Sequence, residues 1–123
     1  MNNNEKNVWT KLLNLYKNLS HLWDKRNNNY LNKNMRQESL RVLLEVYKEI
    51  DKEATVHSLK MKISNLRTCF FRELKKVKAT TQTGSGAQDT YVPTLWYYNN
   101  MIFLSETREP LRKSSYTPID VST

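Results

Sequence analysis

One stretch of the chain decides its fold, residues 55–78, which read TVHSLKMKISNLRTCFFRELKKVK. Its apolar side chains recur every three or four residues, a spacing that places them on one face of an α-helix. These side chains are Leu59, Ile63, Leu66, Phe70, Leu74 and Val77. Thr55 precedes them and is a residue type that caps helix starts. The pattern predicts a helix over residues 56–78 that turns this face towards a core.

The opposite face of this predicted helix is polar. At 100° per residue it carries Met61, Ser64, Asn65, Thr68, Arg72, Lys75 and Lys76, with Lys60, Arg67 and Lys78 towards one flank. Short donors and acceptors therefore dominate its first turns and long cations its later ones. Such a mixture suits a helix in the major groove of DNA, where Asn and Arg make paired contacts with base edges.

The same stretch carries most of the net charge. Residues 55–80 hold seven basic side chains and one acidic one, a balance of +6, whereas the whole chain holds 20 basic and 12 acidic residues, a balance of +8. A local excess of this kind favours an acidic partner at one surface. Nucleic acid is the commonest such partner, followed by anionic membranes and acidic proteins. A lysine-rich face that is merely solvated is the alternative that charge alone leaves open.

Three further segments have helical periodicity, residues 5–19, 35–50 and 94–104. Asn34 is the expected N-cap of the second of them. A helix, a short turn and a more basic helix together form the outline of a helix-turn-helix. The last segment is expected to close the core.

The remaining segments predict connections rather than helices. Residues 79–89 are rich in Thr, Gly, Ser and Gln and predict a flexible connector. Residues 105–123 hold two of the prolines and little apolar periodicity, and predict a disordered tail.

The expected fold class is all-α, a small helical bundle with one closing C-terminal helix. The chain has only two glycines and three prolines, too few for the many tight turns of an all-β protein. Its 123 residues suffice for one core. The predicted centre of that core contains Trp23, Leu40, Ile63, Leu66 and Phe70.

Composition also argues against several classes of protein. A single cysteine, Cys69, permits no intrachain disulfide and no cysteine-based zinc cage. His21, His57 and Cys69 are widely spaced, so no catalytic or metal constellation is expected and the protein is predicted not to be an enzyme and to need no cofactor. No apolar run approaches the length of a membrane span, and the first residues lack the apolar core of a signal peptide. No membrane partner is expected.

Several short motifs, taken in order and spacing, resemble the MADF domain. They consist of Leu22, Trp23 and Asp24, then Tyr30, Asn32, Lys33 and Arg36, then Leu66, Arg67, Phe70 and residues 72–76, then residues 84–86, and finally Tyr91, Pro93, Tyr97, Tyr98, Met101, Phe103 and Leu104. The resemblance spans about residues 8–104 and assigns residues 1–104 to one MADF-like domain. It implies a Myb/SANT-like helix-turn-helix of the kind found in transcriptional regulators, and hence a nuclear location.

Together, the charge pattern and the resemblance predict a module that binds double-stranded DNA through the helix over residues 56–78. The expected base contacts are Ser64, Asn65, Thr68 and Arg72. The expected phosphate contacts are Lys60, Lys62, Arg67, Lys75, Lys76 and Lys78. The alternative is a protein-interaction adaptor of the same fold that docks a chromatin, transcription-factor or transposon-related partner. In either role we expect a monomer or weak self-association.

Overall fold

A computed structural model describes residues 1–82 and 91–106. Its elements are α1 (Asn3–Asn18), η1 (Ser20–Leu22), α2 (Lys33–Tyr47), α3 (Val56–Gln82) and η3 (Asn99–Glu106), where η marks a 3₁₀-helix. No strand occurs within the described residues. The predicted all-α class is confirmed.

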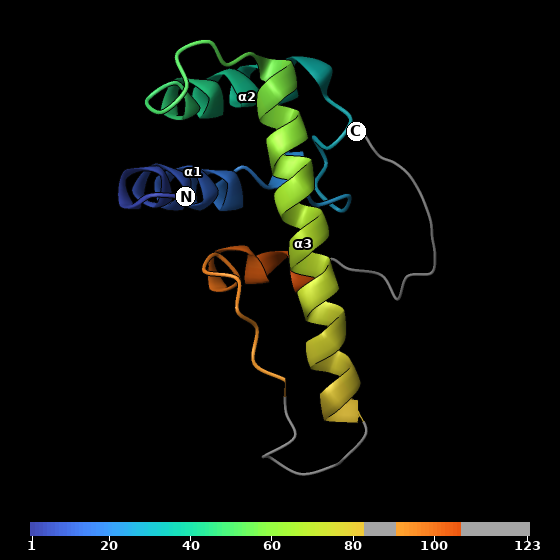
Figure 1. Ribbon diagram of the computed structural model, residues 1–123. Helices are drawn as coiled ribbons and strands as arrows, with labels where there is room; N and C mark the ends of the chain where they lie inside the picture. Colours follow the sequence, from blue (N-terminus) through green and yellow to red (C-terminus); the bar gives the residue numbers. More distant parts are fainter. Residues whose placement is uncertain (83–90, 107–123) are drawn as a thin grey trace.

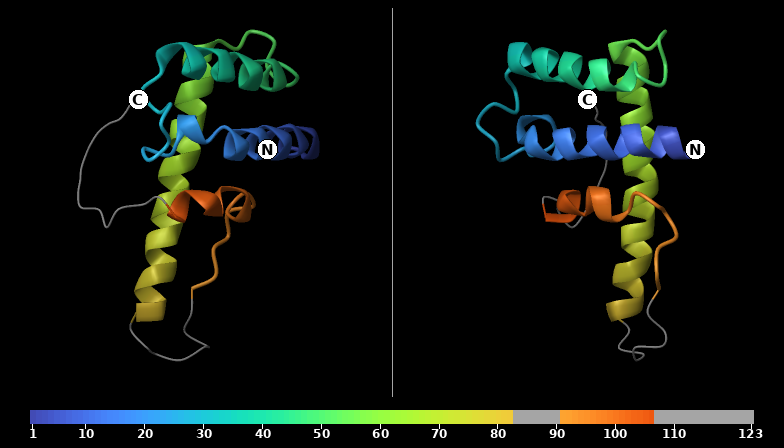
Figure 2. Two further views of the ribbon diagram at one scale, coloured as in Figure 1. Left: turned by 180° about the vertical axis from the view of Figure 1, so that it is seen from behind. Right: turned by 90° about the vertical axis from the view of Figure 1, so that its left-hand side faces the viewer.

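The longest element, α3, organises the others. It has 27 residues, which at 1.5 Å per residue gives about 40 Å. Figures 1 and 2 show α2, α1 and η3 stacked along one side of α3 and crossing it steeply, with α1 between the other two. The last turns of α3 extend beyond η3 (Figure 1).

Helix starts depend on capping side chains. Asn2 caps α1, because its side-chain oxygen accepts from the backbone N–H of Glu5 at 2.8 Å while the Glu5 carboxylate accepts from the Asn2 N–H at 3.0 Å. The predicted cap of α3 is confirmed, since Thr55 Oγ1 accepts from the Ser58 N–H at 3.1 Å. The predicted cap of α2 is wrong. Asn32 rather than Asn34 accepts from the Met35 N–H at 3.1 Å, so α2 begins earlier than expected.

Helix ends also differ from the predicted bounds. α2 ends at Tyr47 and not near Ile50, because Glu49 and Ile50 each bond to the carbonyl three residues back, at 3.0 Å, which tightens the chain into turns. α3 continues past Lys78 to Gln82, so the first residues of the predicted connector are helical. The rest of that connector, and the predicted tail beyond Glu106, lie outside the described residues.

The C-terminal element forms as a shorter and tighter helix than the predicted residues 94–104. Residues 91–95 have no regular secondary structure and 96–98 form a turn, after which η3 begins at Asn99. Backbone bonds again join residues three apart, from the Met101 N–H to the Tyr98 carbonyl oxygen at 3.1 Å. With three residues per turn, Met101 and Leu104 lie on one face, and both are fully buried.

The core fills the space between α3 and the three elements that cross it. Its largest fully buried side chains are Trp9, Phe70, Leu12, Leu13, Leu43, Leu59, Met101 and Leu104. Ile63, Leu66 and Phe70 are buried as predicted. Trp23 and Leu40 are only half-buried and pack at the edge of this cluster, which corrects their predicted central position. Trp23 lies there because its indole N–H donates to the Tyr16 carbonyl oxygen at 2.9 Å and its ring packs on Phe103.

Candidate nucleic-acid interface

The side of α3 that faces away from α1, α2 and η3 is polar and open to solvent. Ser64, Asn65, Thr68 and Arg72 are all exposed on it. Met61 lies among them with 53% of its surface exposed. The buried face matches the predicted helical wheel except that Val77 is only half-buried. We call the five exposed residues Met61, Ser64, Asn65, Thr68 and Arg72 the outer face of α3.

The Thr68 side chain already makes one hydrogen bond within α3. The Thr68 hydroxyl donates to the Ser64 carbonyl oxygen one turn earlier, at 3.0 Å. Its proton is therefore used inside the helix, whereas its oxygen lone pairs and methyl group still face solvent. Asn65 has no intramolecular partner among the described residues, and its amide can both donate and accept.

The six basic side chains predicted to meet phosphates divide into two groups. Lys60, Lys75 and Lys78 are exposed. Lys62 and Arg67 are half-buried, and Lys76 is exposed but paired with Glu73. From the helical wheel all six are equivalent candidates, because a wheel does not show neighbouring elements.

Arg67 lies on the flank of α3 that meets the end of α1. Its Nη1 donates to the hydroxyl oxygen of Tyr16 at 3.0 Å, and its guanidinium lies 5.9 Å from the centre of the Phe71 ring. This geometry gives Arg67 a bracing role between two helices.

Lys62 lies on the other flank of α3, near the start of the helix. It lines a small cavity of about 180 Å³ together with Glu5 and Asp51, at the meeting point of α1, α2 and α3. Burial, followed by the nearby charges of Asp51 and Glu5, raises the pKa of Tyr47 at the same cavity. Lys62 therefore shares this cavity with two carboxylates.

Glu73 is the acidic residue at the centre of the basic stretch, and only 8% of its surface is exposed. Its Oε1 accepts from the Tyr91 hydroxyl at 2.5 Å, and its Oε2 lies 3.5 Å from the Lys76 Nζ. The Tyr91 hydrogen bond, with the Lys76 charge beside it, holds the pKa of Glu73 below its ordinary value, while the same bond raises the pKa of Tyr91. The sequence showed Glu73 as a lone acid but gave no sign of Tyr91 beside it.

Residues 91–98, which we call the strap, run along α3 before η3 begins. The Tyr91 N–H donates to Thr80 Oγ1 at 3.0 Å, and the buried Tyr97 hydroxyl donates to the Leu66 carbonyl oxygen at 3.1 Å. The strap is therefore tied to α3 near its end and near its middle. These ties hold the part of α3 that extends beyond η3.

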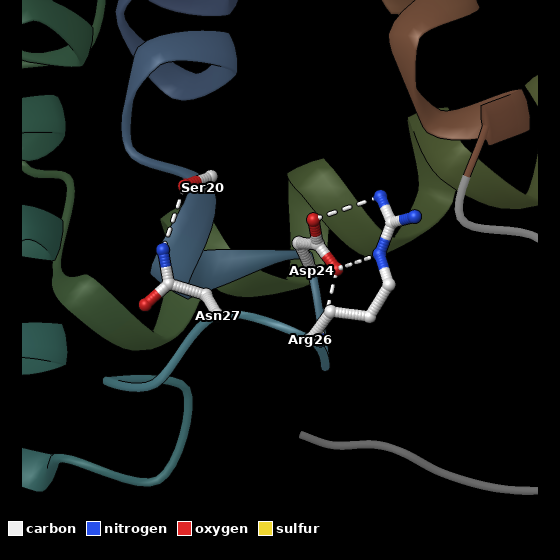
Figure 3. Close-up of polar contacts among 4 residues, drawn as sticks. All are labelled: Ser20, Asp24, Arg26 and Asn27. Atoms are coloured by element: carbon white, nitrogen blue, oxygen red, sulfur yellow. Dashed lines mark hydrogen bonds and ion pairs between the residues drawn. The ribbon is translucent and has the colours of Figure 1, made fainter.

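A structured loop joins η1 to α2, and Figure 3 shows the contacts that hold it. Arg26 pairs with Asp24 through two side-chain bonds of 3.0 and 3.1 Å, and this pairing lowers the pKa of Asp24. The Asn27 amide donates to Ser20 Oγ at 2.8 Å. At the far end of the loop, Arg36 Nη1 donates to the carbonyl oxygens of His21 and Tyr30. The loop thereby fixes how the chain turns from α1 into α2.

The candidate metal-binding or catalytic residues form no common site within the described residues. His21 is buried and bonds to Ser39 Oγ at 2.7 Å, His57 is exposed, and Cys69 is half-buried. Within residues 1–82 and 91–106, no three His, Cys, Asp or Glu side chains are grouped as metal ligands would be. The helices of this same part of the chain include none long and apolar enough to cross a membrane.

Comparison with known proteins assigns the family. No match was found among curated proteins, and none among solved structures. A family model described as "Alcohol dehydrogenase transcription factor Myb/SANT-like", the MADF DNA-binding family, matches residues 12–104. This match runs from within α1 to within η3 and includes all of α2 and α3, with the outer face of α3. The chain therefore belongs to the MADF family of Myb/SANT-like DNA-binding modules.

Proposed function

We propose that this chain is the double-stranded DNA-binding module of a nuclear transcriptional or chromatin regulator, and that α3 enters the major groove. The observation that carries the proposal is the outer face of α3, where Ser64, Asn65, Thr68 and Arg72 are exposed together. The major groove is about 12 Å wide and admits an α-helix with its side chains. Membership of a DNA-binding family supports the same reading.

Each outer-face side chain has a natural counterpart in the groove. Asn65 suits the paired donor and acceptor of adenine, and Arg72 suits the two acceptors of guanine. Ser64 accepts or donates at either kind of base pair. Thr68 offers its methyl group to the methyl of thymine, a role compatible with the internal bond of its hydroxyl.

Phosphate contacts fall on cations that flank this reading surface. Lys75 is ten residues beyond Asn65, about 15 Å along the helix axis, where a straight helix leaves a curved groove and meets its edge. Lys60 and Lys75 are the first candidates because their side chains are exposed, and Lys78 is exposed as well. Arg67 and Lys76 already have an internal partner, and Lys62 shares a cavity with two carboxylates, so we expect each of the three to contribute less.

The experiment is selection of random duplexes at physiological salt by the full chain, followed by affinity measurements on the enriched duplex. An enriched motif supports the proposal. Lys75→Ala should weaken binding to every duplex, whereas Lys52→Ala, an equal change of charge in the turn before α3, should have little effect. If retention is weak and has no motif, sequence-specific reading is wrong.

A protein-interaction module of the same fold is the second candidate. The exposed side chain of Met61 at the N-terminal end of the outer face favours it, because exposed methionine is common at adaptable protein interfaces. Met61→Ala should then abolish capture of the protein partner and leave DNA retention unchanged. If Met61→Ala instead weakens DNA retention and leaves capture of the protein partner unchanged, the result supports the DNA-binding proposal.

A further inference from the structure

A carboxylate, an ammonium and a phenol meet where the strap lies against α3, and they belong to Glu73, Lys76 and Tyr91. The Glu73 carboxylate is almost fully buried, and it accepts from the Tyr91 hydroxyl on one oxygen while the Lys76 ammonium lies near the other. The Lys76 Nζ also lies 5.4 Å from the centre of the Tyr91 ring. Carboxylate and ring thus attract the same cation from adjacent positions.

The neighbouring lysine provides a direct contrast. Lys75 is exposed and has no intramolecular partner in the described part of the chain. Lys76 has 52% of its side chain exposed, against 11% for Glu73, so the carboxylate is shielded from solvent while the ammonium is accessible from one side. Two adjacent lysines of the same helix therefore differ in whether their charge is already balanced.

Tyr91 keeps Glu73 in the charged state that attracts Lys76. Its hydroxyl proton points at the carboxylate, which favours the ionised form, and the short bond fixes the direction in which the second oxygen faces. The strap is held to Thr80 as well, so this arrangement does not depend on one contact.

We propose that Glu73 is an internal counter-ion of the basic stretch, which holds Lys76 against the strap and withholds its charge from DNA phosphates. This inference rests on the proposed DNA-binding function and assigns a regulator of its strength. The buried Glu73 carboxylate pairs with the Lys76 ammonium in the way that a phosphate oxygen of DNA would. The number of cations that α3 offers to a DNA backbone is thereby set from inside the protein.

The first test needs no DNA. The folded full chain is treated with limiting amounts of an amine-acetylating reagent, and the labelling of Lys76 relative to Lys75 is measured by mass spectrometry. Glu73→Gln should raise this ratio, because the amide keeps an oxygen for the Tyr91 hydroxyl but no longer attracts the ammonium. An unchanged ratio in a variant with wild-type circular dichroism overturns the proposal.

The second test measures affinity for one duplex as a function of salt. Glu73→Gln should steepen the plot of log affinity against log salt by about 0.9, the effect of one added phosphate contact, and should tighten binding by about eightfold near 0.1 M salt. The gain should be absent when Lys76→Ala is already present. A gain that persists in the Lys76→Ala background comes from removal of negative charge alone and overturns the proposal.

Tyr91→Phe is the matched control for loosening of the strap. It removes the hydrogen bond to Glu73 but leaves the carboxylate and the aromatic ring beside Lys76, so it should raise affinity less than Glu73→Gln does. If Tyr91→Phe gives the same gain as Glu73→Gln, strap mobility rather than the counter-ion is responsible. If the labelling ratio changes as expected but no variant binds DNA, the counter-ion stands and the proposed function fails.

Discussion

Arg67 of α3 and Tyr16 of α1 are joined by a hydrogen bond of 3.0 Å from the guanidinium Nη1 to the phenol oxygen, across 51 positions of sequence. Tyr16 is itself buried, with 3% of its surface exposed. The bond connects a cation at the edge of the outer face to the helix that packs behind it. The orientation of α3 relative to α1 is therefore fixed in part by a residue that also lies beside the candidate DNA surface.

Removal of this bond should cost stability without altering the reading surface. Tyr16→Phe keeps the buried ring but loses the acceptor, and we expect a loss of about 0.5–1.5 kcal/mol in the free energy of unfolding, measured by urea denaturation. Tyr30→Phe is the control, because the Tyr30 hydroxyl has no partner among the described residues. Equal stability of the Tyr16→Phe variant and the parent would show that Arg67 is not a brace.

The buried face of α3 predicts a large effect for its central aromatic residue. Phe70 is 0% exposed, so Phe70→Ala should lower the free energy of unfolding by about 3–5 kcal/mol. Phe71→Ala should cost less, since Phe71 is half-buried on the flank. Thermal melting followed by circular dichroism compares the two, and a Phe70→Ala variant that melts like the parent contradicts the packing described above.

Mutations should separate the phosphate contacts of α3 from its base contacts. Lys75→Ala should weaken all duplexes about equally and reduce the log–log salt slope by about 0.9. Asn65→Ala should instead lower the preference for the selected duplex over random DNA by about 1–3 kcal/mol, with the salt slope unchanged. Titrations at several salt concentrations distinguish the two patterns. Identical behaviour of both variants would mean that Asn65 reads no base.

Tyr97 should make the fold sensitive to alkali. Burial raises the pKa of Tyr97 well above its ordinary value of 10.0, so the folded protein keeps the phenol proton that the unfolded chain loses. The stabilising effect is therefore complete below about pH 10 and declines as pH rises further. Tyr97→Phe should cost about 1 kcal/mol near neutral pH, through loss of the bond to Leu66, and less in strong alkali. Urea denaturation at several pH values measures this difference, which should not grow with pH.

Local patterns predicted much of this molecule, and contacts between distant segments account for the rest. The buried and exposed faces of α3 followed from the period of its apolar residues, because an amphipathic helix of this length has only one way to bury them. The N-cap of α2 was misplaced because Asn32 and Asn34 are equally good caps, and the backbone chose the earlier one. The 3₁₀ winding of η3 places Met101 and Leu104 on one buried face, and no local pattern specifies this winding.

The outline of the candidate site could also be predicted from local periodicity. Exposure of the outer face is a property of one helix and could be read from its wheel. The pairing of Arg67 with Tyr16 and of Glu73 with Tyr91 could not, because the partners lie 51 and 18 positions away. These pairings distinguish the six basic residues from one another.

The one-sided packing of α3 separates two kinds of evolutionary change. Substitutions among Ser64, Asn65, Thr68 and Arg72 alter no buried contact, so they can accumulate without loss of the folded state. Substitutions on the opposite side of the same helix are constrained by the core. A scaffold divided in this way can diversify what it recognises while its architecture stays constant. A library that varies those four positions among all residues except proline and glycine should remain folded.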